Sequence, residues 1–243
     1  MHGPFLGEFM GTLVLILLGD GVVASVLLKK SKGENSGWIA ITTGWAMAVV
    51  AGIFTAIAFG SPGAHINPAV TLTVALLSGN WSNVGLFWIA QILGAFAGAI
   101  LVWLTYLPHW KVTPDSRAKL GVFCTAPAIR NLPANLLTET IATTCLIVVG
   151  FSFVSKSVSS TGLPAGFGPW LWGVLVWAIG LALGGATGYA INPARDFGPR
   201  LAHAILPISD KGDSDWGYAL VPIIGPLIAS GIGAAIIKLA GIW

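Results

Sequence analysis

Charged residues are scarce in this chain of 243 residues, because Asp, Glu, Lys and Arg together make up only 9% of it. A soluble domain typically carries about 25%, so the sequence predicts a protein whose solvent is lipid. The net charge of +3 is spread over connecting segments without a basic cluster among aromatic residues, which argues against a nucleic-acid partner. The only cysteines, Cys124 and Cys145, lack the spacing of a metal site or a disulfide framework.

Long apolar runs fill the chain instead, since 55% of its residues are hydrophobic. A helix that spans a bilayer needs roughly 20 predominantly apolar residues. Six segments meet this length, at about 4–28, 37–58, 84–107, 134–155, 169–187 and 217–240. The sequence therefore predicts an all-α membrane protein with six transmembrane helices.

Two shorter apolar segments, at about 67–78 and 192–205, rise only about 18 Å each and can cross only half of the membrane. Each begins with Asn-Pro-Ala, in which the Asn is suited to cap a helix and the Pro to occupy its first turn. The boxes are Asn67, Pro68, Ala69 and Asn192, Pro193, Ala194. We expect two re-entrant half-helices that enter from opposite faces.

The chain also repeats itself, because the segment from Leu6 to Gly19 matches the segment from Leu137 to Gly150 and the two Asn-Pro-Ala boxes follow in the same order. Three spans in each copy is an odd number, so the second copy must be inserted upside down. We therefore predict one domain over 1–243, with a first repeat at 1–107, a connecting loop at 108–133 and a second repeat at 134–243.

The loop before each box is non-helical backbone at membrane depth, which is tolerated only in protein or beside a watery cavity. The N-termini of the half-helices carry positive partial charge and would oppose cations and protons, while Asn67 and Asn192 donate hydrogen bonds. Arg195 keeps its charge and offers five donors. A charge at this depth is functional by default, although an ion pair with Asp196 is the alternative.

Two Asn-Pro-Ala boxes, with Gly63-Ala64-His65 before the first and Arg195 after the second, resemble the major intrinsic protein (aquaporin) superfamily over nearly the whole chain. Further positions, among them Asp196, resemble its glycerol-facilitator branch. The resemblance implies that Arg195 is the arginine of the aromatic/arginine selectivity filter. The remaining filter positions then fall on Trp45, Gly180 and Tyr189.

These filter positions suggest the substrate. Water-selective members of the family have His where Gly180 stands, so the missing side chain implies a wider filter. Trp45 and Tyr189 would form an apolar corner, while Arg195 and backbone carbonyls bind hydroxyl groups. Tyr189 stands where a glycerol filter usually has Phe and adds a hydroxyl. For Trp45, a packing or membrane-interface role is the alternative.

Two acidic residues, Glu8 and Glu139, occupy corresponding positions of the repeats inside helices. The resemblance makes both structural, as acceptors of hydrogen bonds from the half-helix loops, whereas a proton relay is the alternative. His65 would line the pore or brace its loop, and Asp196 would line the pore or support a loop. Asp20 also lies inside an apolar run, and we expect it to face either the lumen or a neighbouring subunit.

The resemblance implies a passive channel for glycerol and other small uncharged solutes, among them water, urea, dihydroxyacetone and undissociated lactic acid. It also implies a multi-pass homotetramer in the cell membrane with cytoplasmic termini and without cofactor, metal or enzymatic activity. The alternatives are a water-selective aquaporin and an ion- or proton-coupled transporter. Basic residues such as Lys29 and Arg117 lie in loops that this orientation places outside, against the positive-inside rule.

Overall fold

The computed structural model describes residues 2–243 and contains ten helices. Five of them are long and apolar enough to cross a membrane. These are α1 (Pro4–Leu27), α2 (Trp38–Ala58), α4 (Val84–Thr105), α7 (Leu132–Ser152) and α10 (Leu220–Leu239). The expected sixth span is α8 (Phe167–Leu183), which has 17 residues and rises about 25 Å. It ends before the predicted residue 187, because Gly184 and Gly185 already belong to a turn.

The two half-helices are α3 (Pro68–Ser78) and α9 (Pro193–Ile205). The Asn67 side chain accepts a hydrogen bond from the amide of Ala69 at 2.9 Å, and that of Asn192 accepts one from Ala194 at 3.0 Å. Both asparagines are therefore N-caps, and a proline follows each of them in the first turn. This local chemistry starts each half-helix at the residue that the sequence predicts.

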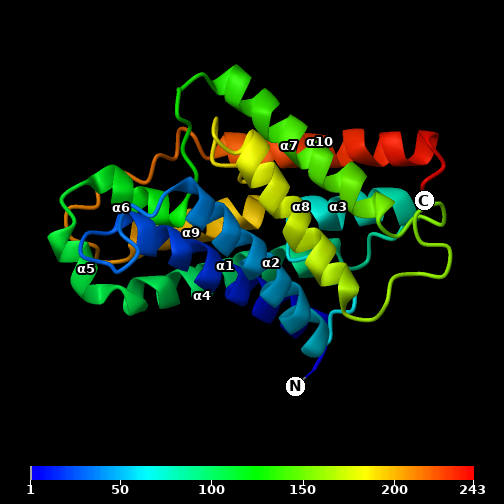
Figure 1. Ribbon diagram of the computed structural model, residues 1–243, viewed down its shortest axis with the longest axis horizontal. Helices are drawn as coiled ribbons and strands as arrows, with labels where there is room; N and C mark the ends of the chain where they lie inside the picture. The colour runs from blue at the N-terminus through cyan, green and yellow to red at the C-terminus, as the bar shows by residue number, and fades with distance from the viewer. Residues whose placement is uncertain (1) are drawn as a thin grey trace.

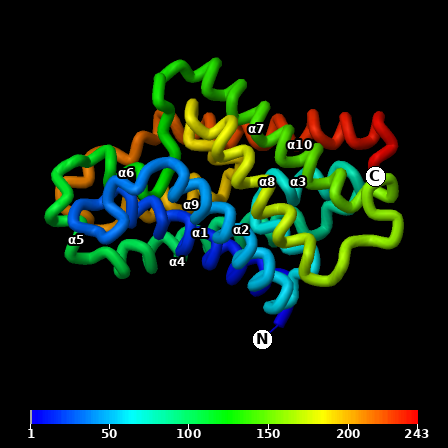
Figure 2. The backbone as a smooth tube through the Cα atoms, viewed as in Figure 1, coloured from blue at the N-terminus to red at the C-terminus, as the bar shows by residue number. Residues whose placement is uncertain are grey.

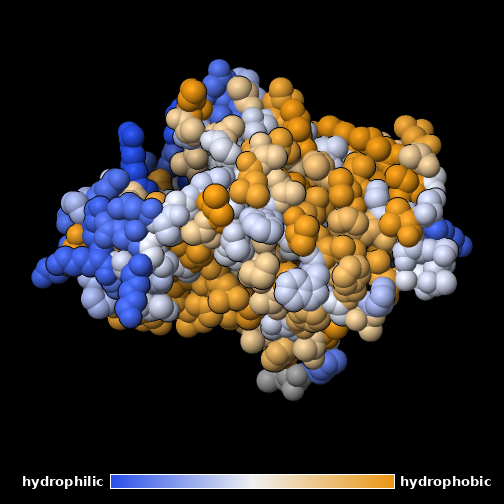
Figure 3. Space-filling model, in the orientation of Figure 1, coloured by the Kyte–Doolittle hydropathy of each residue, from blue (hydrophilic) through white to orange (hydrophobic). Residues whose placement is uncertain are grey.

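Helix α10 runs along the long axis of the molecule, whereas α1, α2, α7 and α8 run obliquely to it (Figures 1 and 2). The C-terminus lies at the end away from α5 and α6, and the N-terminus lies at the lower edge. Hydrophobic side chains cover the middle of the visible face, whereas hydrophilic ones gather at the end that carries α5 and α6 (Figure 3). A protein with this distribution places its apolar middle in lipid and its ends in water.

Small residues let α1 lie close to its neighbours within the fold. A methyl group added to Gly94 of α4 would lie 2.3 Å from the Phe9 carbonyl oxygen, and one on Gly98 would lie 2.6 Å from that of Leu13. Both distances are shorter than any tolerated contact, so the two helix backbones touch at these glycines. The Gly-xxx-Gly spacing of α4 therefore serves packing inside this chain.

The connection at 108–133 contains two short helices that the sequence did not predict, α5 (Leu107–Val112) and α6 (Ser116–Phe123). Asp115 caps α6, because its carboxylate accepts the Arg117 amide at 2.8 Å. Helices of six and eight residues are too short to show a clear apolar period. Packing against the rest of the molecule stabilises them, since Trp110 and Phe123 are buried and stacked at 5.5 Å.

Candidate functional site

A cavity of about 390 Å³ runs past the point where the two half-helices begin. Most of its lining is apolar, with side chains such as Leu15, Val49 and Val176. Among residues 2–243, Arg195 is the only Asp, Glu, Lys or Arg in the lining. Six of the residues predicted for the site line this cavity, namely Trp45, His65, Asn67, Tyr189, Asn192 and Arg195.

The loops that lead into the two half-helices share an unusual backbone. Ala64 and Ile66 in the first loop have φ values of 42° and 44°, and Tyr189 and Ile191 in the second have 39° and 44°. Residues with a side chain seldom adopt this left-handed region, and β-branched Ile does so least readily. Such strain persists only where the surroundings over-determine it. The same conformation at matching positions follows from the internal repeat.

Two buried glutamates hold these strained loops. Glu8 accepts hydrogen bonds from the amides of His65 at 2.8 Å and Ile66 at 2.7 Å. Glu139 accepts them from the amides of Ala190 at 3.0 Å and Ile191 at 2.9 Å. Hydroxyl and amide side chains complete both shells, with Ser61 and Gln91 on Glu8 and Thr187 on Glu139. Every hydrogen bond to the two carboxylates therefore comes from a half-helix loop or from a helix beside it.

The two asparagines connect the half-helices to each other. The Asn67 amide donates to the Ile191 carbonyl at 2.8 Å, and the Asn192 amide donates to the Ile66 carbonyl at 2.8 Å. Each amide nitrogen carries two hydrogens and uses one of them in this bond, so it has one further hydrogen to donate. Both asparagines line the cavity. That remaining donor is therefore available to a solute in the centre of the cavity.

Arg195 follows the second box and lines the cavity. Its Nη1 donates to the Phe123 carbonyl at 3.2 Å and to Asp20 at 3.3 Å. Its guanidinium lies 4.1 Å from the centroid of the Trp45 ring, within the range of a cation–π interaction. Three elements that are distant in the sequence thus position this side chain. The alternative pairing with Asp196 is wrong, because Asp196 points to Arg200 instead.

Tyr189 fills the space beside Gly180. A methyl group on Gly180 would lie 2.8 Å from Cζ of Tyr189 and 2.9 Å from Cγ2 of Thr42. Trp38 meets the same ring edge to face at 5.8 Å and donates from its indole to the Gly180 carbonyl at 3.0 Å. Because Gly180 has no side chain, the tyrosine ring can occupy the space beside it. Gly180 itself does not line the cavity.

His65 both lines the cavity and braces its loop. Besides the bond from its amide to Glu8, its Nδ1 lies 3.1 Å from the hydroxyl of Thr71 in α3. Its ring also packs edge to face on Phe87 at 5.2 Å. His65 therefore contacts both the cavity and the half-helix that follows its loop.

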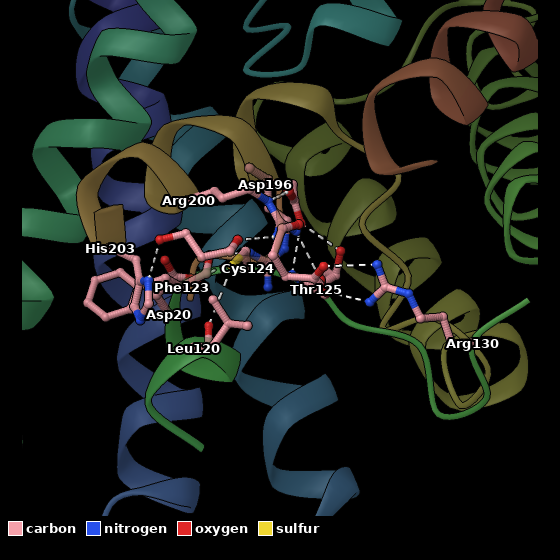
Figure 4. Close-up of polar contacts among 12 residues, drawn as sticks. Asp20, Leu120, Phe123, Cys124, Thr125, Arg130, Asp196, Arg200 and His203 are labelled. Carbon is pink, nitrogen blue, oxygen red and sulfur yellow. Dashed lines mark hydrogen bonds and ion pairs between the residues drawn. The ribbon is translucent and has the colours of Figure 1, made fainter. Parts of the chain in front are cut away.

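Asp196 is fully buried and does not line the cavity. Its carboxylate binds Arg200 at 2.8 Å and accepts bonds from the amide and hydroxyl of Thr125 at 2.8 and 2.7 Å. Figure 4 shows Asp196, Thr125 and Arg200 close together. Arg200 continues the network to the Ser214 carbonyl at 2.8 Å. These contacts attach the connecting loop and the segment after α9 to the second half-helix, so Asp196 supports the site from behind.

An exposed ion pair lies beside this network. Arg130 binds both carboxylate oxygens of Asp215, at 2.8 and 2.9 Å. These hydrogen bonds lower the pKa of Asp215 below its ordinary value of 3.8. A depressed pKa in the folded state means that the pair stabilises the protein above the ordinary pKa and that this contribution is lost as the pH falls through the folded pKa.

We therefore expect Asp215→Asn to lower the melting temperature of the detergent-solubilised protein by about 1–3 °C at pH 7, as for a well-oriented surface pair. Asparagine tolerates the left-handed backbone at this position, where φ is 50°. The difference from wild type should shrink as the pH is lowered below 3.8. Asp213→Asn, an exposed carboxylate in the same segment, is the control. A difference that stayed constant with pH would contradict the assignment.

Sequence reasoning did not identify Thr42, and its expectation that Asp20 faces the lumen or a neighbouring subunit is wrong, because Asp20 is fully buried within this chain and does not line the cavity. The sequence shows Asp20 as an acidic residue inside an apolar run, but it does not show that Arg195 is its partner. Among residues 2–243, no group of three or more His, Cys, Asp or Glu side chains is placed to hold a metal ion.

Comparison with known proteins gives a consistent picture. A family model described as Major intrinsic protein matches residues 2–237. The chain is 59% identical over 235 residues to a probable glycerol uptake facilitator protein of Thermotoga maritima, covering 96% of this chain and 97% of the relative. It is 42% identical over 240 residues to a D/L-lactic acid transporter of Lactiplantibacillus plantarum, covering 96% of each. Among solved structures, the X-ray structure of the aquaglyceroporin from Plasmodium falciparum matches with a TM-score of 0.84 and 28% identity, over 97% of this chain and 94% of that one.

Proposed function

The chain belongs to the major intrinsic protein family, and from this premise we propose that its cavity is the pore of a passive channel that conducts glycerol. The protein is a multi-pass membrane channel and not an enzyme. The observation that carries the proposal is the make-up of the pore near Arg195, where one guanidinium faces a largely apolar cavity that Trp45 and Tyr189 also line.

This arrangement suits a small polyol. Both hydrogen bonds from the Arg195 side chain to residues 2–243 use Nη1, which leaves Nε and Nη2 for hydroxyl groups of a solute. The rings of Trp45 and Tyr189 offer apolar surface to the carbon chain. We accordingly assign Trp45, Gly180, Tyr189 and Arg195 to the selectivity filter, with Gly180 acting by making room for the tyrosine. The relatives named as glycerol uptake facilitators support this substrate.

The centre of the pore explains why a neutral solute passes and cations do not. The N-termini of α3 and α9 meet there, joined by the bonds of Asn67 and Asn192 to the opposite loops. Two positive helix ends that face each other oppose cations. We assign both Asn-Pro-Ala boxes to this barrier, with Glu8, Glu139, His65 and Asp196 as its supports.

Undissociated lactic acid is a second candidate solute. It is a small hydroxy compound, and a relative of 42% identity is named as a D/L-lactic acid transporter. Water, urea and dihydroxyacetone are small and uncharged as well, so we expect the same pore to pass them.

We further propose that residues 1–243 form one channel domain of two repeats, at 1–107 and 134–243 with a connection at 108–133, and that four copies assemble in the membrane. The tetramer rests on the family. We orient both termini toward the cytoplasm, so that α5 and α6 lie outside.

Proteoliposomes test the function directly. Vesicles that contain the protein and are exposed to a glycerol gradient should shrink and then swell again as glycerol enters, much faster than vesicles without protein. The rate should be the same with and without an uncoupler, because a channel needs no ion gradient. Water flux without glycerol entry would favour a water-selective aquaporin, and glycerol entry that stopped with the uncoupler would indicate a coupled transporter.

A further inference from the structure

Asp20 lies in the C-terminal third of α1 and is fully buried within this single chain. It does not line the cavity, and its burial inside one chain leaves no surface for a neighbouring subunit. Its Oδ1 lies 3.3 Å from Nη1 of Arg195, while Oδ2 is buried without a hydrogen-bond partner among residues 2–243. A buried carboxylate is costly unless it is paired. Arg195 is thus the group that accounts for the position of Asp20.

The residue before Asp20 positions a second part of the filter. A methyl group on Gly19 would lie 2.3 Å from Cζ3 of Trp45, so the indole ring rests directly on the helix backbone at this glycine. Trp45 in turn lies under the guanidinium of Arg195 at 4.1 Å. Two consecutive residues of α1 therefore determine where the aromatic and the cationic side chains of the constriction lie.

The charge of Asp20 also changes what the constriction presents to a solute. Arg195 is the only Asp, Glu, Lys or Arg in the lining among residues 2–243. The next ion pair, between Asp196 and Arg200 at 2.8 Å, is balanced within itself. With Asp20 beside Arg195, the constriction has strong donors but no net charge. Without Asp20, one positive charge would remain in a medium of low dielectric constant, where it would attract anions.

We propose that Asp20 is a positioning residue that holds Arg195 against Trp45 and cancels its charge, so that the filter offers hydrogen bonds to neutral solutes without retaining small anions. This inference rests on the proposed function, because it assigns a role within the same pore. It names a determinant of selectivity that lies behind the pore wall and in a different helix from the filter residues.

The test is inhibition of glycerol flux by nitrate, an anion at all relevant pH values. In proteoliposomes, Asp20→Asn should make glycerol entry sensitive to nitrate at concentrations about tenfold lower than wild type, as expected for one unbalanced charge at close range. Asp213→Asn makes the same charge change at an exposed site and should behave as wild type. The double variant D20N/R195Q has a neutral constriction again and should lose the nitrate sensitivity.

A merely structural role for Asp20 would give a different pattern. Destabilised protein would reduce glycerol and water flux in proportion, without nitrate sensitivity and without correction by the second substitution. If D20N were not recovered as a folded protein, Asp20→Ser, which removes the same charge with a smaller side chain, would be judged by the same comparison. Nitrate sensitivity equal to that of wild type in a folded variant would overturn the inference. Absence of glycerol flux in the wild type would instead overturn the proposed function.

Discussion

Gly180→His is expected to abolish most of the glycerol flux while leaving more of the water flux. An added side chain at this position would meet the Tyr189 ring at 2.8 Å and Thr42 at 2.9 Å. The imidazole can fit only if the tyrosine moves, and the cavity is the open side to which it can move. Overpacking of this kind costs about 1–3 kcal/mol, which would lower the rate roughly ten- to a hundredfold if it fell on the passage of the larger solute.

Stopped-flow measurements of glycerol and water entry into proteoliposomes give both rates on the same sample. Gly180→Ala provides a graded version of the change. Gly231→Ala is its matched control, because a methyl group on that helical glycine meets nothing within 4 Å. The double variant G180A/Y189A removes the ring that the methyl group strikes and should recover part of the glycerol rate. Undiminished glycerol entry in folded Gly180→His protein would place the constriction elsewhere.

Glu8→Ala is expected to cause the largest loss of stability. The carboxylate accepts four hydrogen bonds from buried donors, from Ser61 at 2.7 Å, His65 at 2.8 Å, Ile66 at 2.7 Å and Gln91 at 2.8 Å. Each buried donor left without a partner costs about 1–3 kcal/mol, so the sum is several kcal/mol. The same bonds also hold the left-handed residues before the first half-helix, and the channel should therefore fail to form.

Thermal unfolding in detergent, followed by size-exclusion chromatography, measures this effect. Glu34→Ala is a suitable control, because Glu34 makes its bonds to Lys29 and Lys30 in an exposed turn. It should leave the melting temperature almost unchanged. Glu8→Gln should fall between the two, since the amide keeps one acceptor oxygen but turns two hydrogens toward groups that are themselves donors. A Glu8→Ala protein as stable as wild type would show that the loop does not depend on this carboxylate.

The interpretation of Gly180 illustrates how the structure refines a prediction from sequence. The missing side chain suggested a wider filter. In the fold, the ring of Tyr189 occupies the adjacent space and Gly180 lies behind it. The substitution of His for Gly is therefore not a simple narrowing of an open pore, since it also displaces an aromatic ring. No property of residues 180 or 189 taken separately predicts this contact.

Much of the architecture could be predicted, because it depends on local features. Apolar length identifies the membrane helices, Asn-Pro starts each half-helix, and an odd number of spans per repeat makes the repeat inverted. The fold class is confirmed by the family and by the structural match. The exceptions, α5, α6 and the short α8, lie where the apolar signal is brief or interrupted by glycine.

The two Asn-Pro-Ala half-helices and the membrane helices were thus determined by the sequence itself, through capping chemistry and hydrophobic length, while the channel class was implied by the resemblance of its motifs to a family. The tertiary structure alone decided which partners the charged and aromatic side chains have. Arg195 pairs with Asp20, 175 residues away, and not with its neighbour Asp196. Consecutive residues on a helix point in different directions, whereas helices that pack together bring distant residues within hydrogen-bond reach. The contacts that we propose to set selectivity are therefore contacts between helices that no local pattern records.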